Sequence, residues 1–180
     1  MIPTAEDCFQ FMDRYGMLDN IRAHSIVVEK VAGVIAKGLI RAGEDISLEK
    51  IIAGALMHDI GKTSCLGSRY DHSKKGMEIC VANSLNEIAD IVSEHVIIKG
   101  YDPDGDITEK EIIYYSDKRV NHDRVVSLEK RIEYIIDRYS GGKTEICARI
   151  EDNFKICKQV EEKLFSRLDF EPEDLESLVK

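Results

Sequence analysis

The chain contains few prolines, no tryptophan and fewer basic than acidic residues. Its 180 residues include no tryptophan and three prolines, and 25 Lys plus Arg stand against 34 Asp plus Glu. The resulting net charge of −9 disfavours extended nucleic-acid binding, because unaided contact with the phosphates needs a basic face. A small phosphorylated substrate is not excluded, since a metal ion can supply the local positive charge.

Signals for membranes, export and disulfides are also missing. No run of about 18 uncharged apolar residues occurs, so we expect no segment that crosses a membrane. The opening MIPTAEDCFQF is acidic and lacks the charged-then-apolar pattern of an export signal. The 5 cysteines are odd in number and form no CxxC pair, which disfavours a disulfide framework or a zinc ribbon. We therefore expect a cytoplasmic protein whose reduced cysteines are mainly small core residues.

What the sequence does have is helical periodicity over most of one domain's length. No segment shows convincing strand alternation, so we predict an all-α bundle. Capping-box patterns at Thr4–Asp7, Ser84–Glu87 and Thr108–Glu111, and a capping serine at Ser47, mark helix starts. The expected helices lie at about 4–16, 19–37, 47–61, 73–80, 84–96, 108–120, 127–139 and 144–167, with a short tail helix from Pro172.

Several histidines and aspartates fall on helix faces that are otherwise apolar. Residues three, four or seven apart share a face, and the stripes are Ile21–His24–Val28–Val31, Ile51–Ala55–His58, Ile52–Leu56–Asp59, Ile88–Ile91–Val92–His95 and Ile113–Asp117–Val120. A single histidine on such a face is usually a satisfied core residue, but a buried carboxylate must find a partner. Few basic residues accompany this set, so a bound cation would satisfy its members together.

Helical periodicity does not place the two remaining histidines on an apolar helix face. His72 precedes a short predicted helix and is a further ligand candidate, whereas His122 lies in a predicted inter-helix turn and is read as solvated. Imidazole with carboxylate suits Mn, Fe, Co, Ni or Zn better than Ca. The segment YDPDGD partly matches a calcium loop, but its first ligand position would be Gly100, so we expect an ordinary turn.

These residues carry a family resemblance. His24 in RAHS, the doublet His58-Asp59 in MHDIGK and Asp117 in YYSDK are similar to the ordered His, His-Asp, Asp set of the HD superfamily of metal-dependent phosphohydrolases. The resemblance covers roughly residues 18–136 and implies an all-α bundle in which these four side chains hold a metal. Members with two metals add two intervening histidines, which correspond to His72 and His95.

The resemblance implies a function and a division of the chain. It predicts that residues 1–140 form an HD-type metal-binding helical domain and residues 141–180 a C-terminal helical extension of it. Asp59 would bridge two cations, and a metal-bound hydroxide would attack the phosphorus of a small phosphate ester or anhydride, with a nucleotide favoured. Lys62 would contact the phosphate, with Arg69 and Lys118 as weaker candidates. The expected cofactor is one or two divalent ions of Mn, Fe, Co, Ni or Zn, and Mg is also compatible.

Alternatives remain open at this stage. The same superfamily includes di-iron oxygenases with the same six ligands, and a non-catalytic metal- or nucleotide-binding module is a second alternative. The chain lacks the GYP element of the cyclic-di-GMP phosphodiesterases, which disfavours that substrate. We expect no membrane partner, and a homodimer formed through the acidic C-terminal helices is as compatible as a hairpin that packs on its own domain.

Overall fold

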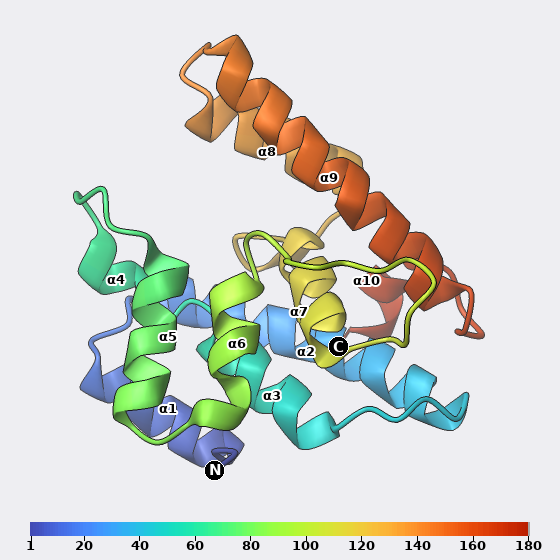
Figure 1. The fold of residues 1–180 in the computed structure, drawn as a ribbon, viewed down its shortest axis with the longest axis horizontal. Coiled ribbons are helices and arrows are strands. Elements are labelled where there is room, and N and C mark those ends of the chain that lie inside the picture. The colour runs from blue at the N-terminus through green and yellow to red at the C-terminus, as the bar shows by residue number, and fades with distance from the viewer. Residues whose placement is uncertain (180) are drawn as a thin grey trace.

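The computed structural model describes residues 1–179 and confirms the all-α fold (Figure 1). Its only sheet within this range is an antiparallel pair of two-residue strands that sequence periodicity did not indicate. None of the helices in residues 1–179 has the length and apolarity to cross a membrane. The elements are α1 (Ala5–Arg14), α2 (Asp19–Arg41), α3 (Leu48–Met57), α4 (Lys62–Cys65), α5 (His72–Ala82), α6 (Asn86–Glu94), α7 (Glu109–Lys118), β1 (Val120–Asn121), β2 (Arg124–Val125), α8 (Leu128–Tyr139), α9 (Thr144–Phe165), η1 (Pro172–Asp174) and α10 (Leu175–Leu178).

Helix starts follow the predicted caps with one exception. Thr4 and Thr108 form the expected capping boxes, and the Ser47 hydroxyl accepts the Lys50 amide. The prediction for Ser84 was wrong: this residue has φ 61°, and α6 begins two residues later without a side-chain cap. The Leu85 amide donates to Cys80 O, so the left-handed Ser84 closes the end of α5 instead of opening α6.

The core is built where α2, α3, α6 and α7 cross. Gly54 in α3 lies so close to its neighbours that a Cβ there would sit 2.6 Å from Ile113 Cδ1 and 2.8 Å from Ile91 Cγ2. The helix α2 runs four residues beyond its predicted end, through Gly38, because Leu39 is fully buried in the same core. This close packing fixes the relative positions of the helices that carry the inward-facing His and Asp side chains.

The cysteines are all free thiols, and three of them are core residues as expected. Cys8, Cys80 and Cys157 are fully buried, and burial raises the pKa of each to about 12. Cys65 and Cys147 are half-buried. The three buried thiols are therefore neutral packing groups at ordinary pH.

The last long helices form a hairpin, α8–α9, that stands above the rest of the bundle (Figure 1). The second half of α9 is anchored by a buried apolar stripe and by polar bonds to the bundle. The stripe is Phe154, Cys157, Val160 and Leu164. Because α8 precedes residue 140 and α9 follows it, this hairpin spans the predicted boundary; the division at residue 140 stays a prediction.

A lysine occupies the centre of the loop that partly matched a calcium site. Lys163 Nζ of α9 donates to the carbonyl oxygens of Asp102 and Asp106 at 2.9 and 3.1 Å. It also contacts Glu111 Oε1 at 2.8 Å. The ammonium group thus takes two of the oxygens that a calcium ion in such a loop would use, the carbonyl of Asp106 and Oε1 of Glu111. The loop serves to attach α9 to the bundle.

Candidate metal centre

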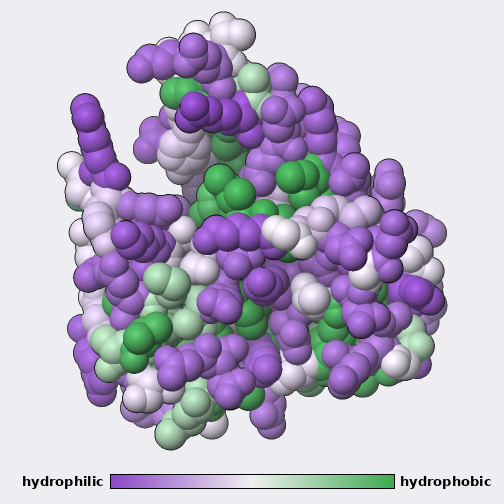
Figure 2. All heavy atoms as spheres, in the orientation of Figure 1, coloured by the Kyte–Doolittle hydropathy of each residue, from purple (hydrophilic) through white to green (hydrophobic). Residues whose placement is uncertain are grey.

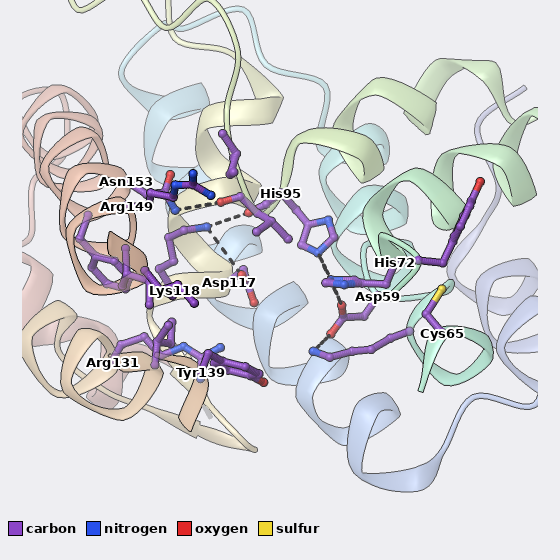
Figure 3. Close-up of a pocket in the computed structure, with 18 of the residues that line it drawn as sticks. Asp59, Cys65, His72, His95, Asp117, Lys118, Arg131, Tyr139, Arg149 and Asn153 are labelled. Atoms are coloured by element: carbon purple, nitrogen blue, oxygen red, sulfur yellow. Dashed lines mark hydrogen bonds and ion pairs between the residues drawn. The ribbon is translucent and has the colours of Figure 1, made fainter. Parts of the chain in front are cut away.

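The six predicted ligand residues come together from five helices, in two groups that share Asp59. Figure 3 shows the four of them that line the adjacent pocket, Asp59, His72, His95 and Asp117. His24 lies within α2 and Asp117 within α7, while His58 and His95 each stand at the residue that follows the last turn of a helix. Asp59 follows His58 directly. His72 is the first residue of α5 and not part of the preceding loop, because the Asp71 side chain caps that helix at the Ser73 amide.

Backbone carbonyls hold three of the four imidazoles. The Nδ1 atoms of His58 and His95 lie 2.7 Å from Ala55 O and Val92 O, the carbonyls three residues earlier. His24 Nδ1 lies 2.8 Å from the carbonyl of His122. A carbonyl can only accept, so each Nδ1 carries a proton, and in the neutral form of each ring Nε2 keeps the lone pair that a metal ion would take.

The Asp59 carboxylate stands between two groups of nitrogen atoms. Its Oδ2 lies 3.5 Å from His58 Nε2, and its Oδ1 lies 3.4 and 3.5 Å from the Nε2 atoms of His72 and His95. On the first side, Asp117 Oδ1 lies 3.0 Å from His24 Nε2 and 3.7 Å from His58 Nε2. Two ligands that each lie about 2.1 Å from one metal are about 3–3.5 Å apart, so both groups have suitable spacing for a cation.

Two buried atoms in this cluster have no hydrogen-bond partner within residues 1–179. They are His58 Nε2 and Asp59 Oδ1, in side chains that are 0% and 1% exposed. Burying a polar atom without a partner costs free energy. A divalent cation on each side of Asp59 would satisfy both atoms, so the residues present fit such an ion.

The charge states also suit metal binding. Burial opposes ionisation of Asp59, but the neighbouring His58, His95 and Lys62 outweigh it and hold the pKa of this carboxyl well below its usual value. Burial lowers the pKa of His72 to about 4. At neutral pH the cluster therefore presents an ionised Asp59 and a neutral His72, the forms that bind metals. Burial lowers the pKa of His58, but the carboxylates of Asp59 and Asp117 outweigh it and raise this pKa, so a metal ion would replace a proton there.

The glycine of MHDIGK has a steric role. A Cβ on Gly61 would press against the carbonyl of His72 and lie 2.6 Å from the Gly76 amide nitrogen. Only a residue without a side chain lets the first turn of α5 pack this closely on the turn after Asp59. That approach brings His72 within reach of Asp59 Oδ1.

The three residues predicted to contact phosphate lie in different positions relative to the ligand cluster. Lys62 Nζ lies 2.7 Å from Asp59 Oδ2, at the mouth of the cluster. Lys118 is buried and donates to the carbonyls of His95 and Tyr114, with Asp117 Oδ2 at 3.7 Å. Lys118 lines the cleft, but its ammonium group is bound to these carbonyls and therefore supports the ligand residues. Arg69 is exposed and does not line the cleft.

A cleft of about 540 Å³ opens onto the cluster. We call the six ligand candidates, of which Asp59, His72, His95 and Asp117 line the cleft, the ligand wall. The facing side chains of α8 and α9 form the hairpin wall. Hydrophobic side chains gather in the hollow below the hairpin, while the outer surfaces are mostly hydrophilic (Figure 2). The hairpin wall consists of Arg131, Ile135, Tyr139, Ile146, Arg149, Ile150, Asn153 and Phe154.

Sequence reasoning missed the hairpin wall and the carbonyl acceptors. His122 was read as a solvated turn residue; its φ is 55° and its exposed side chain does lie in the β1–β2 turn, but its backbone oxygen orients His24. The weak signal was the pair Asn121-His122 between two apolar segments, a sequence compatible with a tight turn. No motif marked Arg131 or Arg149.

The comparison with protein families agrees with this geometry. The sequence profile of the family described as "HD domain" matches residues 21–142. A tRNA (cytidine(56)-2'-O)-methyltransferase of Thermoplasma volcanium is 27% identical over an alignment of 152 residues, which covers 77% of this chain and 42% of that protein. Its namesake in Picrophilus torridus is 27% identical over 155 residues, 77% of this chain and 41% of that protein. The chain thus spans less than half the length of these relatives, and no solved structure matches it.

Proposed function

The chain belongs to the HD domain family, and from that premise we propose that it is a metal-dependent phosphohydrolase that acts on a small phosphate ester or anhydride. The ligands proposed are His24, His58, Asp59 and Asp117 for one divalent ion and Asp59, His72 and His95 for a second. A nucleotide is the favoured substrate class. The match to the two methyltransferases covers less than half of each, so their methyl transfer is not carried over.

The position of the Asp59 carboxylate carries this proposal. Each of its oxygens faces a different set of imidazole nitrogens, and one of them is buried without a hydrogen-bond partner within residues 1–179. A purely structural aspartate in a helical core is normally paired with a base or a cap. Within residues 1–179, Lys62 is the only lysine or arginine paired with Asp59, and it contacts Oδ2 alone.

The side chains around the cleft would hold the metal ions and orient the substrate phosphate. When bound, divalent ions at this site would supply an acidified water and neutralise phosphoryl charge. Lys62, which lines the cleft beside Asp59, would stabilise negative charge that develops on the phosphoryl oxygens. The volume of about 540 Å³ is in the range of small-ligand sites and suits a nucleotide.

Elemental analysis of purified protein, followed by a phosphate-release screen, tests the proposal. The substrates would be nucleoside phosphates, dinucleoside polyphosphates, cyclic nucleotides and, because the relatives are named for tRNA, a tRNA as well. We expect release that depends on a divalent metal and does not require oxygen. Oxygen consumption by iron-loaded protein with an organic substrate would instead support the di-iron oxygenase. Metal binding without any turnover would support a non-catalytic module.

A further inference from the structure

Arg131 on the hairpin wall is a charged side chain without a counter-ion. Its Nη1 donates to Asn121 Oδ1 at 3.0 Å, and its Nε is buried without a hydrogen-bond partner. Among the ion pairs of residues 1–179 none includes this guanidinium. A half-buried cation in this state is stabilised by an anion that comes from outside the chain.

The guanidinium is also held in place. Asn121 fixes one of its nitrogens from β1, and its carbon lies 5.7 Å from the centre of the Tyr134 ring. In Figure 3, Arg131 and Tyr139 lie on the hairpin side of the cleft, with Asp117 between Arg131 and Asp59. A fixed arginine presents its donors without further ordering, which favours binding of a planar or tetrahedral oxyanion.

The other cations of the cleft are already engaged or lie at its rim. Lys62 contacts Asp59, and Lys118 donates to two carbonyls. Arg149 lines the cleft from the exposed face of α9.

We propose that Arg131 binds a second, non-reacting phosphoryl group of the substrate, so that the enzyme prefers compounds with two phosphoryl groups over those with one. This rests on the proposed function: the reacting phosphoryl group would lie at the ligand wall, and the second would face the hairpin wall. Arg131 is then a specificity-determining residue supplied by α8, outside the proposed metal-ligand set.

Calorimetry with non-hydrolysable probes tests this without any turnover. Methylenediphosphonate carries two phosphonyl groups and methylphosphonate carries one, and both are titrated into Mn²⁺-loaded protein. The ratio of their affinities is measured in wild type, Arg131→Gln and Arg138→Gln. Arg138 is a matched control, because it lies on the same helix, is exposed and does not line the cleft.

We expect the preference for the diphosphonate to fall about 10- to 100-fold in Arg131→Gln, the affinity equivalent of a charged hydrogen bond, and to stay at the wild-type value in Arg138→Gln. If Arg131→Gln does not fold, the same measurement is made on Asn121→Asp. A carboxylate at position 121 would neutralise the guanidinium and should lower the ratio of diphosphonate to monophosphonate affinity. An unchanged ratio in the deciding variant, or no preference in the wild type, overturns the proposal. Absence of phosphate release from every substrate would defeat the proposed hydrolysis but leave this binding result standing.

Discussion

The two walls of the cleft are held in different ways. On the ligand wall, His58, Asp59 and His95 are at most 2% exposed, and backbone carbonyls fix both imidazole rings. On the hairpin wall, α8 buries only Leu128, and the residues of α9 from 144 to 153 include no buried side chain. The first wall is part of the core, whereas the second covers the cleft from one side.

This difference suggests a division of roles. A metal site needs ligand atoms within a few tenths of an ångström of their required positions, which only a packed core supplies. A surface that selects a substrate can be less buried, and its apolar groups are free to meet a ligand. Tyr139, at 60% exposed, and Ile97 of the α6–α7 connection, at 61%, line the cleft in this way.

The largest effect is expected from removing the shared carboxylate of the ligand wall. Asp59→Ala should lower metal-dependent phosphate release by more than about 10³-fold, because both groups of metal ligands include this carboxylate. Removal of a single hydrogen-bond donor that stabilises a transition state usually costs less than this. The fold should persist, since the unpaired buried carboxylate is lost together with its cation. Metal content, thermal stability and turnover are measured on the same sample.

Asp90→Ala provides the control for that variant, because Asp90 is an exposed residue of α6. It should match the wild type in all three measurements. If Asp59→Ala kept wild-type turnover while losing metal, hydrolysis would have to occur at another site.

The next effect concerns the packing that brings His72 into the ligand wall. Gly61→Ala should push α5 away from the turn, destabilise the protein by about 1–3 kcal/mol and reduce metal occupancy at the His72–His95 side. Gly33→Ala is the matched control, since the only neighbour of a Cβ there is Glu29 Oε1 at 3.7 Å. That variant should be neutral or slightly stabilising. Equal melting temperatures and metal contents for the two variants would contradict the steric role of Gly61.

Lys62→Ala should have a smaller effect on turnover. We expect a loss on the order of 10²-fold if the ammonium stabilises developing phosphoryl charge, with metal content close to that of the wild type. A parallel measurement of Lys62→Arg should show partial recovery, because the charge is kept. Full activity in Lys62→Ala would remove this residue from the catalytic assignment.

The smallest effect is expected when the hairpin wall is loosened. Asn153 Nδ2 donates to Val96 O at 3.0 Å, and its side chain accepts from the Tyr114 hydroxyl at 2.8 Å. Asn153→Ala should cost about 1–2 kcal/mol of stability, measured by chemical denaturation, and leave metal content unchanged. A loss of metal in this variant would show that the two walls are not independent.

The sequence predicted the ligand wall better than the hairpin wall for a physical reason. Ligands such as His24 and Asp117 must sit on buried faces, so they interrupt apolar stripes that a periodicity argument detects. The tight β1–β2 turn leaves no such trace, since its strands are two residues long. Arg131 is one of many charged residues on an amphipathic helix, and only the tertiary structure shows that its Nε is buried without a partner.

Helix ends were the least predictable feature within the site. The expected helix at 47–61 stops at Met57, because the His58 ring takes the carbonyl of Ala55 and the chain then turns. The same arrangement at His95 ends α6. A local hydrogen bond from an imidazole to a terminal carbonyl thus both ends the helix and orients the ligand, and no propensity scale contains that information.

Anomalous diffraction from crystals soaked in Mn²⁺ would show whether Asp59 is shared by two metal ions. The account predicts two manganese peaks about 3.5–4 Å apart, one among His24, His58 and Asp117 and the other between His72 and His95, with Asp59 in contact with both. Manganese bound elsewhere, or no manganese at Asp59 at saturating concentration, would contradict it.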